Sequence, residues 1–210
     1  NLAYLYRFRL APEGQLANEN IVGNRGGVNS GLGAVFLVDT RDNVANATKG
    51  RFLEVSSYFY GRYVGGDFRY TNVLGTYNQY WRLPWGRDHF LASNTFVNLN
   101  FGNPPFVHLS PAGGEDILRG YPRNRYRDLR FLGTQLEYRM PLFWRIGVVG
   151  FAGVGEVFDR FSDVRLDNLK YSFGGGLRLM LNRKERVNIR LDYGIGRGST
   201  GFYLGVMEAF

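Results

Sequence analysis

Ion pairing is the chemistry for which the segment GGEDILRGYPRNRYRD, residues 113–128, is best suited. It places four arginines beside three carboxylates: Arg119, Arg123, Arg125 and Arg127, with Glu115, Asp116 and Asp128. A guanidinium is always charged in proteins and binds a carboxylate through parallel hydrogen bonds. Two interpretations follow. The segment is either a charged loop in contact with solvent, or a loop whose arginines reach carboxylates inside the fold.

Catalytic chemistry is not indicated in the rest of the chain. It has no cysteine and only two histidines, His89 and His108, which are too few for most metal cages. It contains no Gly-x-Ser-x-Gly elbow, and the stretches GVGEVF and FGGGL lack the strand, turn and helix of a dinucleotide site. We therefore predict that the chain is not an enzyme and has no cofactor and no metal site.

The net charge of +8 suits nucleic acid, an anionic lipid surface or a polar lumen. The arginines, however, lie on strand faces and in one loop instead of forming a stripe along a helix, and no nucleic-acid-binding fold is recognisable. We therefore predict no nucleic-acid partner.

The elements that must position these charges are strands, because the dominant hydrophobic period of the chain is two. In LGTQLEYRM, residues 132–140, the apolar Leu132 and Leu136 alternate with the polar Gln135 and Glu137. LAYLYRFRL and VNIRLDYGI follow the same pattern, and the polar side of the latter carries Asn188, Arg190, Asp192 and Gly194. About ten strands are expected, near residues 2–10, 31–40, 51–60, 68–83, 89–101, 132–140, 146–158, 171–181, 187–195 and 202–210.

A soluble sandwich and a transmembrane barrel both alternate in this way. A sandwich buries its apolar face and uses strands of about 5–6 residues. Here the strands are longer, the apolar faces carry large aromatics, and glycine recurs on the polar side, as where an inner wall must leave room. Spanning strands need only about 9–11 residues. We predict an all-β fold, an antiparallel transmembrane β-barrel with an outward apolar band and a polar interior.

Four stretches of the chain resemble, in the same order, the bacterial surface antigen family, the outer-membrane superfamily that includes BamA and TamA. GLGAVFLVDTRDNVANATKG (31–50) resembles its strand-and-turn signature, with the turn residues Asp39, Arg41, Asp42 and Asn43. Residues 113–128 resemble its long sixth extracellular loop, whose motif is here Arg119, Gly120 and Tyr121. GTQLEYRMPL (133–142) resembles the next strand, and GFYLGVMEAF (201–210) the terminal strand, with Phe202, Leu204, Val206 and Phe210. Ordered matches are far more specific than one tripeptide.

The resemblance implies that this loop, within residues 102–130, folds into the barrel and that its motif arginine reaches a carboxylate on the inner wall. Arg119 would be that arginine, and the period of two independently places Glu137 on the polar face. The family has a second acidic residue on the strand after next, but the matching position here is Gly153. Glu156 has the opposite parity unless a bulge intervenes. We therefore expect Glu137 alone to hold Arg119.

The end of the chain is expected to be a terminal strand with a lipid-facing apolar side. Glu208 interrupts that side, where a carboxylate is costly unless it lies near the interface. Trp81, Trp85 and Trp144 stand near strand ends, as in the aromatic girdles of membrane barrels.

The family resemblance implies a barrel of the bacterial outer membrane that inserts or translocates proteins. Its partners would be outer-membrane lipids and lipopolysaccharide, with client outer-membrane proteins or a second barrel chain, since an exposed strand edge adds a client strand through main-chain hydrogen bonds. The alternative is a structural or pore-like barrel, or the membrane anchor of a fused effector, without insertase activity.

Residues 1–210 are expected to form a single transmembrane domain, with no periplasmic POTRA domain readable in them. The family's barrels have about sixteen strands, so the chain is expected to be either a small closed barrel or the C-terminal part of a longer one. In a small closed barrel, the strand at 2–10 would pair antiparallel with the strand at 202–210.

Overall fold

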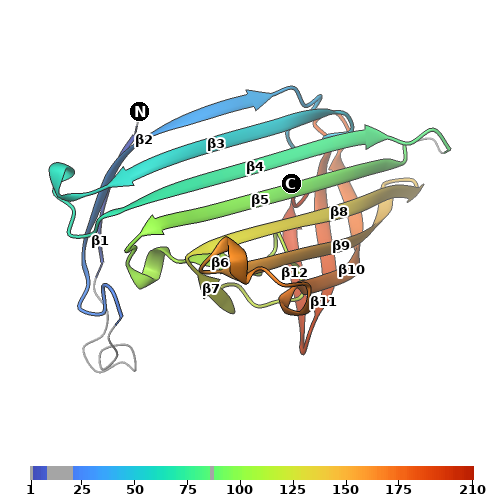
Figure 1. The fold of residues 1–210 in the computed structure, drawn as a ribbon. Coiled ribbons are helices and arrows are strands. Elements are labelled where there is room, and N and C mark those ends of the chain that lie inside the picture. Colours follow the sequence, from blue (N-terminus) through green and yellow to red (C-terminus); the bar gives the residue numbers. More distant parts are fainter. Residues whose placement is uncertain (1, 9–20, 86–87) are drawn as a thin grey trace.

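The structure, a computed structural model, describes residues 2–8, 21–85 and 88–210. Ten strands form one antiparallel sheet in the order β1-β2-β3-β4-β5-β8-β9-β10-β11-β12, and β6 pairs with β7 in a separate hairpin. The strands are β1 Leu2–Phe8, β2 Gly27–Asp39, β3 Gly50–Tyr60, β4 Tyr70–Arg82, β5 Phe90–Gly102, β6 Ser110–Ala112, β7 Tyr126–Asp128, β8 Arg130–Phe143, β9 Ile146–Phe158, β10 Lys170–Asn182, β11 Val187–Gly196 and β12 Ser199–Val206. Figure 1 shows that the strands of the large sheet follow one another around a strongly curved wall.

In residues 2–8, 21–85 and 88–210, helical structure is limited to single turns of 3-10 helix in the connections. They are η2 Arg62–Val64, η3 Phe106–His108, η4 Phe161–Asp163 and η5 Leu166–Asn168. In the described part of the chain, no helix is long and apolar enough to cross a membrane.

The wall has two distinct ends. At one end, which we call the turn end, the described connecting residues are 40–49, 83–85, 88–89, 144–145 and 183–186. At the other, the loop end, they are 61–69, 103–129, 159–169 and 197–198. The longest connection, between β5 and β8, therefore belongs to the loop end and contains the arginine-rich segment.

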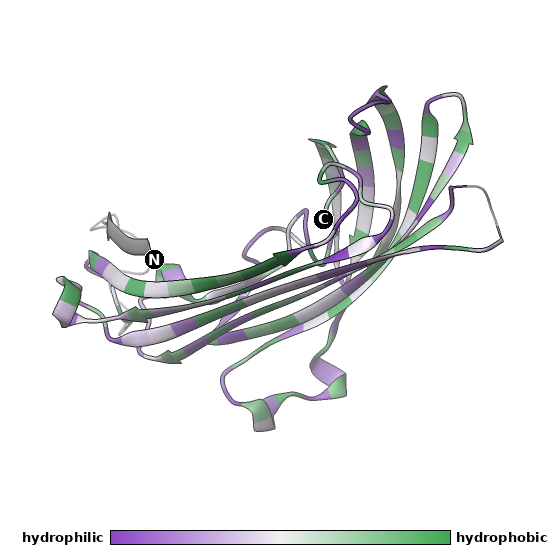
Figure 2. Ribbon diagram, turned by 90° about the horizontal axis from the view of Figure 1, so that it is seen from above, coloured by the Kyte–Doolittle hydropathy of each residue, from purple (hydrophilic) through white to green (hydrophobic). Residues whose placement is uncertain are grey.

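The two faces of the wall differ in polarity, as the period of two predicts. In β8, Gln135 and Glu137 are fully buried on one face, whereas Leu132 and Leu136 are about half exposed on the other (48% and 49%). In β11, Arg190 and Asp192 are likewise buried on the polar side. Figure 2 shows this alternation of hydrophobic and hydrophilic residues along the strands. The predicted alternation is confirmed for these strands.

The polar face is the concave side of the wall. Asp42, in the connection between β2 and β3, pairs with Arg186, between β10 and β11, at 2.6 Å. These two connections belong to distant strands of one sheet, so they meet only if the sheet curves around the polar face. The convex side carries exposed apolar residues, among them Leu132, Leu136, Phe173, Leu177, Phe202, Leu204 and Val206.

The ten strands of the large sheet agree with the predicted number, but several strand boundaries differ. β2 begins at Gly27 instead of near residue 31, and β1 ends at Phe8, since residues 9 and 10 lie outside the described residues. Within the described ranges β1 pairs only with β2, and β12 only with β11. The pairing of 2–10 with 202–210, which a small closed barrel would need, is therefore not formed there.

The predicted terminal strand is wrong at its end. β12 stops at Val206, and Met207, with a φ of 71°, turns the chain toward the concave side. Phe202, Leu204 and Val206 remain exposed on the convex side, whereas Phe210 packs inside against Ala47, Tyr80 and Ala92. The physical reason is Glu208, whose carboxylate would face lipid if the strand continued and instead meets arginines inside.

Candidate functional site

Arg119 is the centre of the site, held from two strands at once. Its side chain is fully buried and its Nη2 donates to Glu137 of β8. Its Nη1 donates to Oδ2 of Asp192 in β11 at 2.6 Å. The guanidinium also lies 3.6 Å above the ring of Phe151 in β9. We call Arg119, Glu137 and Asp192 the loop anchor, because they join the long loop to the inner wall.

The second carboxylate corrects the expectation of a single partner. Gly153 supplies no acid, and Glu156 pairs in register with the outward Leu132 and contacts Nζ of Lys170 at 2.5 Å. The missing acid comes from β11, as Asp192. The alternation in the sequence predicted that Asp192 lies on the polar face of its strand. It did not predict that the loop would reach that strand.

The loop anchor belongs to a wider ion network, and every buried charged side chain that the structure describes has a partner of opposite sign. Arg139 contacts Glu137 at 2.7 Å, and Arg178 contacts Asp192 at 2.5 Å. Arg178 also reaches Glu208 at 2.7 Å. Arg190 lies 2.9 Å from Glu115 of the loop and 3.5 Å from Asp192. An isolated buried charge is strongly destabilising, so this alternation of signs is what permits so many charges on one inner face.

Two glycines let the loop approach the wall. Gly120 has a φ of 112°, which favours glycine, and a Cβ there would lie 2.6 Å from the carbonyl carbon of Ile195. On β11, a Cβ at Gly194 would lie 2.6 Å from the carbonyl carbon of Arg119. Both clashes are with main-chain atoms, which cannot rotate away. The motif glycine and the inner glycine of β11 therefore set the depth at which Arg119 sits.

The rest of the motif is bonded to the last two strands. The Gly120 amide donates to Oη of Tyr203 at 2.9 Å, and the Gly120 carbonyl accepts from Oγ of Ser199 at 2.8 Å, both in β12. Oη of Tyr121 accepts from the Arg197 amide at 2.9 Å. The loop thus connects β8 to β11 and β12, in the part of the wall nearest the unpaired side of β12.

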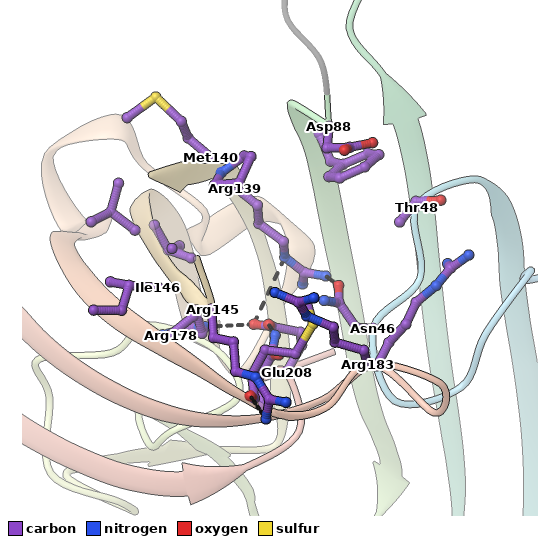
Figure 3. Close-up of a pocket in the computed structure, with 18 of the residues that line it drawn as sticks. Asn46, Thr48, Asp88, Arg139, Met140, Arg145, Ile146, Arg178, Arg183 and Glu208 are labelled. Atoms are coloured by element: carbon purple, nitrogen blue, oxygen red, sulfur yellow. Dashed lines mark hydrogen bonds and ion pairs between the residues drawn. The ribbon is translucent and has the colours of Figure 1, made fainter. Parts of the chain in front are cut away.

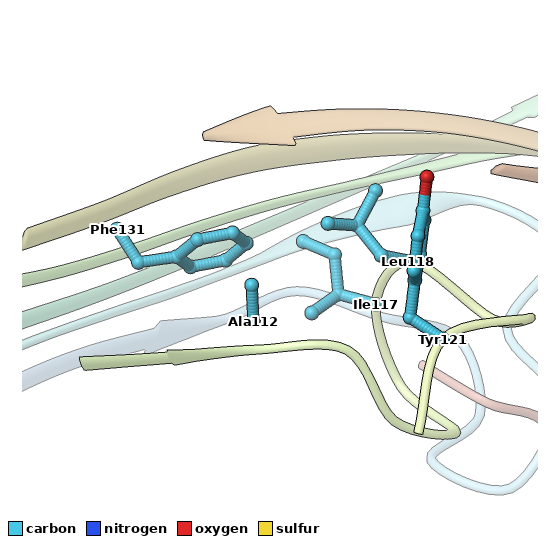
Figure 4. Packing of buried hydrophobic residues seen from close by; sticks show 5 residues of the cluster. All are labelled: Ala112, Ile117, Leu118, Tyr121 and Phe131. Atoms are coloured by element: carbon cyan, nitrogen blue, oxygen red, sulfur yellow. The ribbon is translucent and has the colours of Figure 1, made fainter. Parts of the chain in front are cut away.

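An apolar cluster packs the loop against the inner wall. Ala112, Ile117, Leu118 and Tyr121 of the loop pack against Phe131 of β8, and all are buried (Figure 4). Full burial of a large aliphatic or phenylalanine side chain, such as Leu118 or Phe131, stabilises by about 1.5–3 kcal/mol, so the loop is held by packing as well as by charge.

The predicted turn residues form a self-bonded connection between β2 and β3. Arg41 pairs with Asp39 through Nε at 3.0 Å and Nη2 at 2.7 Å. Asp42 accepts from the Thr48 amide at 2.8 Å and pairs with Arg186. Although burial opposes ionisation, these donors hold the pKa of Asp42 below its usual range. Asn43 Oδ1 accepts from the amides of Ala45 and Asn46 at 2.8 Å.

The other residues singled out from the sequence lie away from the loop anchor. His89 contacts Oη of Tyr138 near the turn end, and His108 contacts Asn29 near the loop end. Trp81, Trp85 and Trp144 are exposed near the turn end, the arrangement expected of an interfacial girdle. Among the described residues no group of three or more metal-ligating side chains could hold an ion.

The function that this arrangement of groups supports is to hold the loop against the inner wall. Every charged group of the loop anchor is engaged by groups of opposite sign, and charge-assisted hydrogen bonds are about twice as strong as neutral ones. The arrangement fastens a loop to three strands and can be released only by separating several buried charges.

The comparisons with known proteins agree with this geometry. The model of the Omp85 superfamily domain matches residues 23–210. Among solved structures, BamA from Haemophilus ducreyi lacking POTRA domains 1–3 has a similar fold, with a TM-score of 0.70 at 13% sequence identity. The match covers 86% of this chain and 42% of that chain, so this chain spans less than half the length of that structure. A comparison with curated proteins gives no match. The predicted antiparallel barrel fold is confirmed.

Proposed function

Because the chain belongs to the Omp85 superfamily, a family of outer-membrane insertase- and translocase-type barrels, we propose that it takes part in inserting or translocating proteins at the bacterial outer membrane. Its clients would be outer-membrane proteins, and its convex face would contact outer-membrane lipids, with lipopolysaccharide on the outer side. The loop end would face outward, because it carries the loop that resembles the family's sixth extracellular loop.

The observation that carries the proposal is the connection of the charged loop to β12. Gly120 is bonded to Tyr203 and Ser199 of β12, while Arg119 is paired with Glu137 of β8. On its other side β12 has no partner strand in the described ranges. Such an edge presents main-chain donors and acceptors to which another strand can add. The loop anchor would hold this edge in shape while a client strand pairs with it.

Location is tested by how the chain behaves in detergent. The exposed apolar side chains of the convex face, such as Phe202 and Leu204, motivate an outer-membrane location. Folded barrels resist unfolding by detergent until they are heated, so unboiled and boiled samples should migrate differently on a gel. Recovery of the chain in the soluble fraction without detergent would contradict the location.

Activity is tested in lipid vesicles. The purified chain is reconstituted, an unfolded eight-stranded outer-membrane protein is added, and its folding is followed by the heat-dependent gel shift. We expect faster folding than in empty vesicles or in vesicles with an unrelated barrel. Equal rates in all three would favour the structural, pore-like or anchoring alternative, and conductance across a planar bilayer would then identify a pore.

A further inference from the structure

A cationic cavity lies at the turn end of the concave side, next to the ion network of the loop anchor. Its volume is about 390 Å³, and six arginines line it: Arg82, Arg139, Arg145, Arg178, Arg183 and Arg186. The carboxylates in its described lining are Asp88 and Glu208. Figure 3 shows arginine side chains from β8, β10 and the adjoining connections gathered near Glu208. A volume of this size is typical of ligand-binding sites.

Two of these arginines carry charge that no carboxylate of the described chain compensates. Arg145 donates to the Leu181 carbonyl at 3.0 Å, and Arg183 donates to the Trp144 carbonyl at 3.3 Å. Neither forms an ion pair within the described ranges, whereas Arg186 is paired with Asp42. A carbonyl oxygen does not neutralise a guanidinium, so the rim of the cavity keeps two positive charges that are not paired with a carboxylate of the described chain.

The deeper arginines already bind the carboxylate of Glu208, which belongs to the chain segment that follows β12. Glu208 accepts from Nε of Arg178 and from Nδ2 of Asn188, both at 2.7 Å. The main chain of the same segment is bonded to the wall, since the Glu208 amide donates to the Ala45 carbonyl at 3.2 Å. The cavity is therefore shaped to accept a carboxylate together with the main chain that carries it.

The lining also suits the carbon stem of an acidic side chain. Met140, Ile146 and Val148 stand beside the arginines in the cavity. The two methylene groups of a glutamate can contact these side chains while its carboxylate meets a guanidinium.

We propose that this cavity binds an acidic polypeptide segment of a partner protein, which enters at the turn end and places its carboxylates on Arg145 and Arg183, next to Glu208. A peptide fits better than a small inorganic anion, because the carboxylate already in the cavity is fixed through its main chain as well as its side chain. Arg145 and Arg183 do not contact the loop anchor, although the deeper arginines of the cavity, Arg139 and Arg178, contact its carboxylates. The proposal adds a partner class to the proposed function.

The test uses the full chain in detergent micelles at low ionic strength, where contacts between exposed charges are least screened. Fluorescently labelled hexaglutamate is titrated and its anisotropy is measured, with hexaglutamine as the uncharged control. The test variant is Arg145→Gln with Arg183→Gln. The matched control is Arg160→Gln with Arg165→Gln, which removes the same charge from exposed residues at the loop end. A third variant, Arg145→Lys with Arg183→Lys, keeps the charge.

We expect hexaglutamate to bind and hexaglutamine not to bind. The Arg145→Gln, Arg183→Gln variant should bind hexaglutamate about tenfold more weakly, and the loop-end control should change by less than about twofold. The lysine variant should recover most of the affinity, which separates lost charge from a disturbed fold.

Three outcomes would overturn the proposal. The unsubstituted chain does not bind hexaglutamate; or both glutamine variants weaken binding equally, which would indicate attraction to the overall charge of +8; or inorganic pyrophosphate binds and hexaglutamate does not, which would identify a site for small anions. Because none of these measurements involves client folding, failure here is distinguishable from failure of the insertion assay.

Discussion

Oδ2 of Asp192 accepts a hydrogen bond from Nη1 of Arg119 at 2.6 Å, although 73 positions separate the two residues in the chain. Through this contact the loop reaches β11 as well as β8. Deeply buried, paired charges of this kind are costly to separate, since each partner that remains is left without compensation.

Removing the cation should loosen the loop. We expect Arg119→Ala to lower the free energy of unfolding by about 2–5 kcal/mol and to speed tryptic cleavage within residues 119–130. Arg125→Ala is the matched control, because it removes one charge and one tryptic site from the same loop at an exposed position. Equal protease resistance of the two variants would show that the charge of Arg119 does not anchor the loop.

The two acids should act together. Glu137→Gln leaves Arg119 with Asp192, and Asp192→Asn leaves it with Glu137, so each single change should have a moderate effect on heat stability. The double variant leaves Arg119 without a carboxylate in the described chain and should cost more than the sum of the two. A double-mutant cycle measures this. If Glu137→Gln alone were as damaging as the pair, a single acid would hold the loop.

The two close-approach glycines should not tolerate a methyl group. Gly120→Ala and Gly194→Ala each place a Cβ 2.6 Å from a main-chain carbon, and we expect a loss of roughly 1–3 kcal/mol with faster cleavage of the loop. Gly150→Ala in β9 is the control, because no heavy atom lies within 4 Å of its Cβ position. Comparable melting temperatures for all three variants would contradict this account.

Asp42 should make the turn end sensitive to acid. Its pKa is lowered in the folded chain, so its contribution to stability is complete above the pKa of the unfolded chain, about 3.9, and is lost as the pH falls through the lower folded value. Asp42→Asn should therefore be less stable than the original chain at neutral pH, by about 1–3 kcal/mol. The difference should shrink below about pH 4. Melting curves at several pH values measure it; a difference independent of pH would contradict the assignment.

The sequence by itself determined the strands of the wall, apart from their ends, and the face on which residues within those strands lie. A strand sends successive side chains to opposite sides, so the positions of Gln135 and Glu137 opposite Leu132 and Leu136 follow from spacing alone. The segment around Arg119 could be recognised as a loop because its charged residues interrupt the alternation of apolar and polar residues.

Only the tertiary structure decided which charges meet. Asp192 and Glu137 belong to strands separated by β9 and β10, and their common contact with Arg119 depends on the curvature of the whole wall. The inward turn at Met207 likewise depends on Arg178 and Asn188 being in place to receive Glu208. Local spacing fixes the direction of a side chain relative to its own strand. The partner of a buried charge is fixed by strand register and sheet curvature, which are properties of the assembled sheet.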